Sequence, residues 1–238
     1  MNFEEFKNEM QKKLEIIGLS EHDKKLQSFF RYMQLLLEWN EKINLTAITD
    51  EKEIILKHFI DSLTISKYCT SGNIIDIGTG AGFPGIPLKV WNDNLEVTLL
   101  DSLNKRITFL DKVIKELEIN NIYALHGRAE DVAVQAEYRE KYDFAVSRAV
   151  APMNVLLEYM LPFVKVGGKC ICMKGSNIEE LENSKKALEV LGGKVIEIEE
   201  FCLPETDMKR NNIVIEKVRK TPDRYPRKAG KPSREPII

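Results

Sequence analysis

The chain has 238 residues, of which 43% are apolar and 30% charged, and its formal net charge at pH 7 is −2. This composition is ordinary for a globular protein and fits one large domain, or a core domain with an accessory piece. It excludes a transmembrane protein, because no stretch approaches the ~20 consecutive apolar residues of a membrane span. The N-terminus is charged from Glu4 onward and lacks the apolar region of a signal peptide, so we expect a cytoplasmic protein.

The first 68 residues predict helices. Five apolar residues at helical spacing indicate a helix over residues 3–17, which ends at Gly18: Phe3, Phe6, Met10, Leu14 and Ile17. A second amphipathic run covers residues 21–40. Asp50 and Glu53 resemble a capping box at the start of a third helix, which extends through Ile60. We expect residues 1–68 to form a small helical cap, with the apolar stripes in its core.

From residue 73 the pattern changes to alternating strands and helices, which is typical of a parallel sheet. The predicted strands are 73–77, 96–101, 121–125, 143–147, 168–174, 194–201 and 212–217, and the predicted helices are 85–92, 104–118, 130–136, 152–161 and 177–191. Only the loop from Pro204 to Arg210 separates the last two strands, so they must pair antiparallel. Seven strands with a closing hairpin predict the methyltransferase variant of the Rossmann sheet, an α/β fold, over residues 69–218.

The turn after the first predicted strand is rich in glycine. Residues 74–85 read IIDIGTGAGFPG, an apolar strand that leads through glycines into a helix start. Glycine lets the backbone adopt positive φ and lets a ligand approach closely, and the helix that follows presents free N–H groups. In an open α/β sheet, this crossover is where a nucleoside-type cofactor binds. Gly78 and Gly80 are therefore candidate cofactor-binding residues.

Two cofactor classes compete for this turn, and a glycine-rich turn without any ligand is the third alternative. Residues 80–85 fit GxGxxG, the fingerprint of dinucleotide sites. Asp76, however, would repel a pyrophosphate at close range, whereas it suits the ammonium group of S-adenosylmethionine, directly or through water. Pro84 also removes an N–H donor that a dinucleotide site needs. The residues therefore favour S-adenosylmethionine as the cofactor.

Three further loops follow predicted strands. Asp101 ends the second strand, where the fold places an acid for ribose hydroxyls; Ser102 could serve instead, and Asp101 could also cap the next helix. In this fold the loop after the third strand, GRAED over residues 127–131, passes the adenine, although Glu130 there could simply cap a helix. Arg148 follows the fourth strand and could orient the carboxylate of the donor or a phosphate of the acceptor.

The fourth strand end carries no cysteine, and no histidine is close to it in sequence. This argues against a covalent route and against an acceptor that must lose a proton first. The N7 atom of guanine has an exposed lone pair and needs no base before attack. We therefore expect in-line methyl transfer that depends on positioning, without an essential general base.

Cysteines and the C-terminal charges bear on metals and partners. Four cysteines, Cys69, Cys170, Cys172 and Cys202, show no CxxC or paired spacing, so we expect no metal site. Residues 217–234 hold eight cations and one acid. We expect residues 219–238 to form a basic tail that contacts the phosphates of a polyanion. The alternative is a solvated chain end without a partner.

Several segments together resemble one known family, the bacterial small-subunit ribosomal RNA methyltransferase G family, also called glucose-inhibited division protein B. They are IIDIGTGAGFPGIPL, LLDSLNKR, HGRAEDV and SRAV, with WNEKINLTAITD and HFIDSL in the cap and KRNNIVIEK and YPRKAGKP near the C-terminus. The resemblance implies methyl transfer from S-adenosylmethionine to N7 of one guanine in 16S ribosomal RNA. It implies donor contacts at Gly78, Phe83, Ala129, Glu130 and Arg148, with Asp101 near the ribose.

The resemblance also suggests Arg128 and Arg210 as functional basic residues. We expect the partner to be 16S ribosomal RNA or the small ribosomal subunit, including an assembly intermediate, and the protein to be a monomer. Three other functions stay open. A dehydrogenase is disfavoured by Asp76 and by the closing hairpin. A ribosome-binding module without catalysis is disfavoured by the full set of pocket residues, and a small-molecule methyltransferase by the basic tail.

Overall fold

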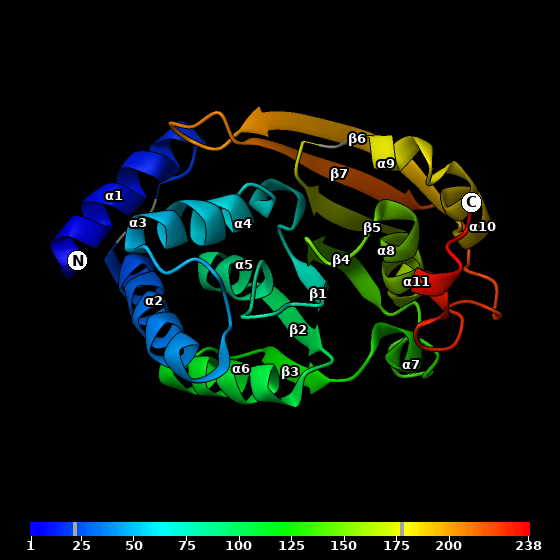
Figure 1. Ribbon diagram of the computed structural model, residues 1–238, viewed down its shortest axis with the longest axis horizontal. Helices are drawn as coiled ribbons and strands as arrows, with labels where there is room; N and C mark the ends of the chain where they lie inside the picture. The colour runs from blue at the N-terminus through cyan, green and yellow to red at the C-terminus, as the bar shows by residue number, and fades with distance from the viewer. Residues whose placement is uncertain (21–22, 177–178) are drawn as a thin grey trace.

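The computed structural model describes residues 1–20, 23–176 and 179–238, and it contains the seven predicted strands in one sheet (Figure 1). The strands are β1 (Gly72–Ile77), β2 (Leu95–Asp101), β3 (Ile122–His126), β4 (Tyr142–Arg148), β5 (Val164–Lys174), β6 (Gly193–Cys202) and β7 (Lys209–Lys217). Their spatial order is β3-β2-β1-β4-β5-β7-β6. β7 lies between β5 and β6 and runs antiparallel to both. The predicted fold class and the closing hairpin are confirmed.

The strand order places the predicted turn at a switch point. β1 pairs in parallel with β2 on one side and β4 on the other, so the chain leaves β1 for one half of the sheet and returns to start the other half. Loops that follow β1, β2 and β4 therefore meet at the same edge. A crevice at such a point is where ligands bind in open α/β sheets.

Helices cover both faces of the sheet. One apolar cluster joins α5 (Gly85–Trp91) and α6 (Asn104–Glu116) to the first face, and a second joins α8 (Met153–Met160) and α10 (Lys185–Leu191) to the other. Parallel strands buried on both faces explain the continuous apolar runs of the sequence. Within the described residues, no helix is both apolar enough and long enough to cross a membrane.

The N-terminal helices pack directly on the first face. They are α1 (Phe3–Ile16), α2 (Asp23–Ile43), α3 (Glu51–Ile54), a π-helical segment (Ile55–Ile60) and α4 (Asp61–Leu63), and the first two residues of the predicted helix 21–40 lie outside the described residues. Asp50 caps α3 as predicted, because its side chain accepts the Glu53 N–H at 2.9 Å. Apolar residues of these helices, such as Phe6 and Phe59, belong to the same cluster as Leu99 of β2.

The prediction of one helix over residues 177–191 is wrong. Residues 177–178 lie outside the described residues, and the rest forms two short helices, α9 (Glu179–Glu182) and α10. The Ser184 hydroxyl donates to the Glu180 carbonyl at 2.5 Å, and its N–H donates to the Leu181 carbonyl. Serine side chains compete with the helical backbone for hydrogen bonds in this way, which ends α9. The helix predicted over 130–136 is a single turn, α7 (Ala129–Val132).

The C-terminal segment folds back on the second face of the sheet and ends with a helical turn, α11 (Lys231–Arg234), beside α8 (Figure 1). Ile237 is part of the second apolar cluster. Lys217, counted among the basic residues, is fully buried and donates to the carbonyl oxygens of Leu161 and Val164 at 2.5 and 3.1 Å. Lys217 is therefore not available to a polyanion, although it contributes to the positive charge of residues 217–234.

Candidate functional site

Asp76 accepts hydrogen bonds from two residues of the glycine-rich turn. This carboxylate is fully buried, and its Oδ2 accepts the Thr79 hydroxyl at 2.6 Å and the Gly85 N–H at 2.8 Å. Burial, the largest cause, raises the pKa of Asp76 to about 7. Asp76 is not among the residues that line the cavity above it. Through its Oδ2, Asp76 therefore ties the two ends of the turn together. A contact between Asp76 and the ammonium group of a cofactor, directly or through water, stays a prediction.

A cavity of about 700 Å³ opens above this turn, where β1, β2 and β4 end. Gly78 and Gly80 form part of its wall with φ of +66° and +63°, in the left-handed region that glycine tolerates. Among the described residues, a Cβ added to Gly80 would have no atom within 4 Å. The turn thus presents bare backbone to the cavity, which is what close approach of a ligand requires.

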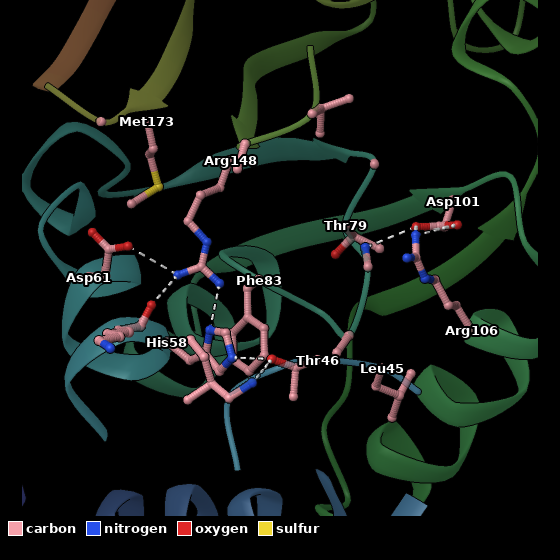
Figure 2. A pocket seen from close by; sticks show the side chains of 18 of the residues that line it. Leu45, Thr46, His58, Asp61, Thr79, Phe83, Asp101, Arg106, Arg148 and Met173 are labelled. Carbon is pink, nitrogen blue, oxygen red and sulfur yellow. Dashed lines mark hydrogen bonds and ion pairs between the residues drawn. The ribbon is translucent and has the colours of Figure 1, made fainter. Parts of the chain in front are cut away.

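Asp101 lies at one end of this cavity, where it accepts hydrogen bonds from three residues (Figure 2). Its Oδ2 accepts the Gly80 N–H at 2.9 Å and Arg106 Nη1 at 3.1 Å, and its Oδ1 accepts the Leu103 N–H at 2.9 Å. The last bond joins the carboxylate to the residue before α6. Asp101 therefore lies in the cavity wall, and the capping alternative is wrong, because Leu103 is the N-cap residue of α6 and no side chain caps this helix among the described residues.

Arg148 lies at the other end, within a cluster that the sequence did not indicate (Figure 2). Its Nη1 donates to the Lys57 carbonyl at 2.8 Å and to Asp61 Oδ2 at 3.2 Å, and its Nη2 donates to His58 Nδ1 at 3.0 Å. The guanidinium carbon lies 5.1 Å from the centre of the Phe83 ring. A guanidinium has five N–H donors, so these three bonds leave two without a partner among the described residues.

Asp61 balances two arginines in this cluster. Besides Arg148, it lies 3.4 Å from Arg210 Nε, measured from Oδ1. The Asp61 side chain is 5% exposed, and the two arginine side chains are 15% and 24% exposed. One buried carboxylate between two guanidinium groups leaves a net positive charge, and Arg210 is the more open of the two arginines. The fold thus brings Arg148 and Arg210 to the same carboxylate. Neither the periodicity nor the motifs of the sequence predicted that these two arginines lie together.

His58 is held as a neutral ring. Burial, followed by the nearby Arg148 charge, lowers the pKa of His58 to about 3. Because the guanidinium can only donate, His58 Nδ1 is the acceptor, and Nε2 therefore carries the ring proton. Nε2 lies 3.0 Å from the Thr46 hydroxyl oxygen, to which it donates. The imidazole also stacks on Phe83, with ring centres 4.4 Å apart and planes 12° apart. Both nitrogens are therefore occupied within the protein.

Sequence reasoning missed His58, Asp61 and Thr46 as members of the site. The available signal was the spacing of three between His58 and Asp61, which puts both side chains on one face of a helix. That spacing does not identify a partner 90 positions away. Asp61 needed the tertiary structure to connect it with Arg148.

A second cavity, of about 300 Å³, adjoins the first and shares Gly78, Asp101, Ser102 and Val150 with it. The predicted residues Arg128, Ala129 and Glu130 line this second cavity. The candidate residues therefore form two groups that meet at Asp101. The structure does not bring Arg128 to the cluster around Arg148.

The two cavities fit S-adenosylmethionine better than a dinucleotide. The polar groups are a carboxylate at the junction, suited to accept from ribose hydroxyls, and the Arg148 guanidinium in the larger cavity, suited to bind a carboxylate. Asp76 and Asp101 both lie against the glycine turn, where a pyrophosphate would have to bind. Two acids at that place disfavour an anionic ligand such as a pyrophosphate.

The chain matches a family model described as rRNA small subunit methyltransferase G (GidB) over residues 25–210. A ribosomal RNA small subunit methyltransferase G from Acetivibrio thermocellus is 58% identical over 222 residues, which cover 92% of each chain. One from Clostridium botulinum strain 657 is 51% identical over 237 residues, 98% of this chain and 99% of the other.

Solved structures with a similar fold include TYW2 from M. jannaschii in complex with AdoMet, with a TM-score of 0.54 and 18% identity over 67% of this chain and 76% of that one. The 16S rRNA (adenine(1408)-N(1))-methyltransferase from Catenulisporales acidiphilia, with its cosubstrate SAM, has a TM-score of 0.53 and 14% identity over 68% of this chain and 92% of that one. At such identities these structures establish the fold alone. The identities above 50% along nearly the whole chain go further: this protein belongs to the rRNA small subunit methyltransferase G family.

Proposed function

We propose that this protein transfers the methyl group of S-adenosylmethionine to N7 of a specific guanine in 16S ribosomal RNA. The observation that carries the proposal is the pair of adjoining cavities at the switch point, with Asp101 at their junction and Arg148 in the larger one. Membership of the family supports the same substrate class.

We assign the donor to both cavities. The proposed contacts are Gly78, Gly80, Phe83, Asp101, Ala129, Glu130 and Arg148. When bound, S-adenosylmethionine supplies an electrophilic methyl group on a positively charged sulfur. Asp61 offsets the charge of Arg148, so this arginine can hold the carboxylate of the donor while its repulsion of a cation is reduced. Arg210 supplies the remaining positive charge, which suits a phosphate of the acceptor.

The work left to the protein is orientation. Guanine N7 offers its lone pair at neutral pH, so attack requires no removal of a proton. Holding the nucleophile in line with the methyl group can contribute roughly 7–11 kcal/mol. We do not expect His58 to act as a base, because its Nδ1 accepts from Arg148 and its pKa is lowered to about 3.

The direct test is methyl transfer from labelled S-adenosylmethionine to free 16S ribosomal RNA, to a partly assembled small subunit and to the mature subunit, followed by mapping of the modified base. We expect label on guanine N7 of at least one of these substrates. Donor binding without any transfer would support a ribosome-binding module, and transfer only to small molecules would support a small-molecule methyltransferase.

The chemical step is expected to be independent of pH between about 6 and 9, a range that contains the usual histidine and cysteine pKa values. Single-turnover rates at saturating donor and RNA measure it. His126→Ala should stay within about tenfold of the parent, because losing a true general base typically costs roughly 10²–10⁴-fold. His126 is exposed, and its Nε2 lies 3.2 Å from the Ser102 carbonyl oxygen.

For His58→Ala we expect a different result, because this change also removes the ring nitrogen that accepts a hydrogen bond from Arg148. Its rate is expected to fall while the pH profile stays flat. The pKa of Asp76 lies within the tested window at about 7, so Asp76→Asn, which keeps a side-chain acceptor for the turn, removes that titration as a control. A bell-shaped profile that disappears in either histidine variant would contradict the proposal.

Asp101→Ala is expected to weaken donor binding by roughly 1–3 kcal/mol, the scale of a lost hydrogen bond to a charged group. Isothermal calorimetry measures this affinity, and RNA affinity should change less. Arg106→Ala is the matched control: it removes the ion-pair partner of Asp101 and leaves the carboxylate in place. Unchanged donor affinity in Asp101→Ala would assign the ribose to Ser102 or to backbone groups.

Three exposed cations of the C-terminal segment, Arg224, Lys228 and Lys231, are proposed phosphate contacts. Replacing all three with Ala should weaken RNA binding and leave donor binding unchanged. Each lost contact should remove roughly 0.7–0.9 from the slope of log affinity against log salt. Fluorescence titrations at several salt concentrations measure that slope. An unchanged slope would make these residues solvated surface charges.

A further inference from the structure

The second cavity has a wall that the sheet and its loops do not supply. Residues 225–235, here called the C-terminal strap, pass beside α8, and Gly230 and Ser233 of the strap line this cavity. The Ser233 and Tyr159 hydroxyl oxygens lie 2.8 Å apart, so strap and α8 meet at the cavity rim. The strap follows β7, the last strand of the sheet, and nevertheless forms part of the cavity wall.

A buried ion pair fastens the strap. Arg227 donates through Nε to Glu158 Oε1 at 2.9 Å and through Nη2 to Oε2 at 2.6 Å, and its backbone N–H donates to Oε1 at 2.7 Å. Glu158 of α8 is fully buried. Paired bonds from a guanidinium to a carboxylate fix orientation as well as distance. Three of the five guanidinium N–H groups of Arg227 bond within the protein, to Glu158 and to the Glu235 carbonyl oxygen. The phosphate contact expected of Arg227 stays a prediction.

The strap also acts on a proposed donor-binding residue. The Gly230 N–H donates to Glu130 Oε1 at 2.9 Å. Gly230 has φ of +78°, a conformation that side chains disfavour, so glycine allows the strap to turn toward Glu130 at this point. Glu130 is therefore oriented by a segment 100 positions away.

We propose that the C-terminal strap completes the adenosine end of the donor site, with Arg227 as the positioning residue. This inference rests on the proposed function. The second cavity suits a purine, because apolar Ile77, Leu100 and Val150 and the Tyr159 ring share its lining with polar groups of the strap and of Glu130. Without the Arg227–Glu158 pair, the strap keeps only its weaker contacts, such as those of Gly230 and Ser233, and ordering it again opposes donor binding.

The test compares two ligands by isothermal calorimetry on the full-length protein: S-adenosylmethionine, and 5′-methylthioadenosine, which lacks the amino-acid end. Arg227→Met is expected to weaken both by roughly tenfold or more, the scale of a lost charged hydrogen bond. Lys220→Met is the matched control, an exposed cation of the same C-terminal region, and should bind both ligands as the parent does. Equal affinities in Arg227→Met and the parent would overturn the proposal.

A second measurement uses the unaltered protein, in case Arg227→Met does not fold. Trypsin can cut after Lys228, an exposed strap residue followed by Ala229. We expect 5′-methylthioadenosine to slow this cut, since a ligand that binds the closed strap disfavours its release. An unchanged rate at saturating ligand would overturn the proposal. A parent protein that binds neither ligand would overturn the proposed function as well, whereas binding without protection would overturn only the role of the strap.

Discussion

Gly80→Val is expected to abolish detectable donor binding, with a loss of roughly a hundredfold or more. Gly80 has φ of +63°, and the space beside its Cα is open cavity among the described residues. A branched side chain would fill the space assigned to the donor. The Gly80 N–H, which donates to Asp101, would also shift if the backbone relaxed from the left-handed region. Calorimetry with S-adenosylmethionine measures the effect.

Gly18→Val is the matched control for this change. Gly18 has φ of +73° and equally open surroundings among the described residues, but it follows α1, and it is not among the residues lining either cavity. Both variants carry a similar backbone strain, of about 1–2 kcal/mol, so they should lose similar stability while only Gly80→Val loses the donor. Near-parent affinity in a folded Gly80→Val protein would contradict the placement of the donor.

Asp61→Ala is expected to reduce methyl transfer by roughly a hundredfold, the loss that misplacement by about 1 Å can cause, and to destabilise the fold by roughly 3 kcal/mol. The change leaves the Arg148 and Arg210 guanidinium groups facing each other without their shared carboxylate. Repulsion would move Arg148 away from His58 and the Phe83 ring. Single-turnover rates and denaturant unfolding measure the two effects.

Two control variants accompany Asp61→Ala. One separates the charge of Asp61 from its shape, and the other measures the effect of removing an acid from a surface ion pair. Asp61→Asn keeps the shape and removes the charge, so it should reproduce most of the loss in rate. Glu38→Ala removes an exposed ion pair, in which Glu38 Oε1 lies 2.9 Å from Lys42 Nζ. This change should leave the unfolding midpoint nearly unchanged. Parent-like rates in Asp61→Asn would show that Arg148 does not depend on this charge.

The sheet, the glycine turn and Asp101 could be predicted because each depends on residues that are close in sequence. Apolar runs of strand length, separated by helical spacing, determine the βα alternation, and a seven-residue loop between the last two strands leaves only antiparallel pairing. Asp101 is the last residue of its strand, so the predicted end of that strand was enough to place it at the carboxyl edge of the sheet. The Gly78–Gly80 turn follows from the same local logic.

The placement of Asp76 shows where local reasoning stops. Strands buried on both faces carry no alternation that tells which side chain reaches the cavity and which lies under the next helix. The sequence therefore did not reveal that Asp76 Oδ2 accepts hydrogen bonds from Thr79 and Gly85 within the turn. The break at Ser184 was missed for a related reason, since helical spacing on either side continues across it.

The sequence alone determined the fold class and favoured the cofactor class, whereas the tertiary structure decided which charged side chains pair inside the protein. Arg148 meets His58 and Asp61 from 90 and 87 positions away, and Arg227 meets Glu158 from 69 positions away. A sequence states how many charges a segment carries, but not which of them become buried. A buried charge must have a partner, and that partner is chosen by the packing of distant segments.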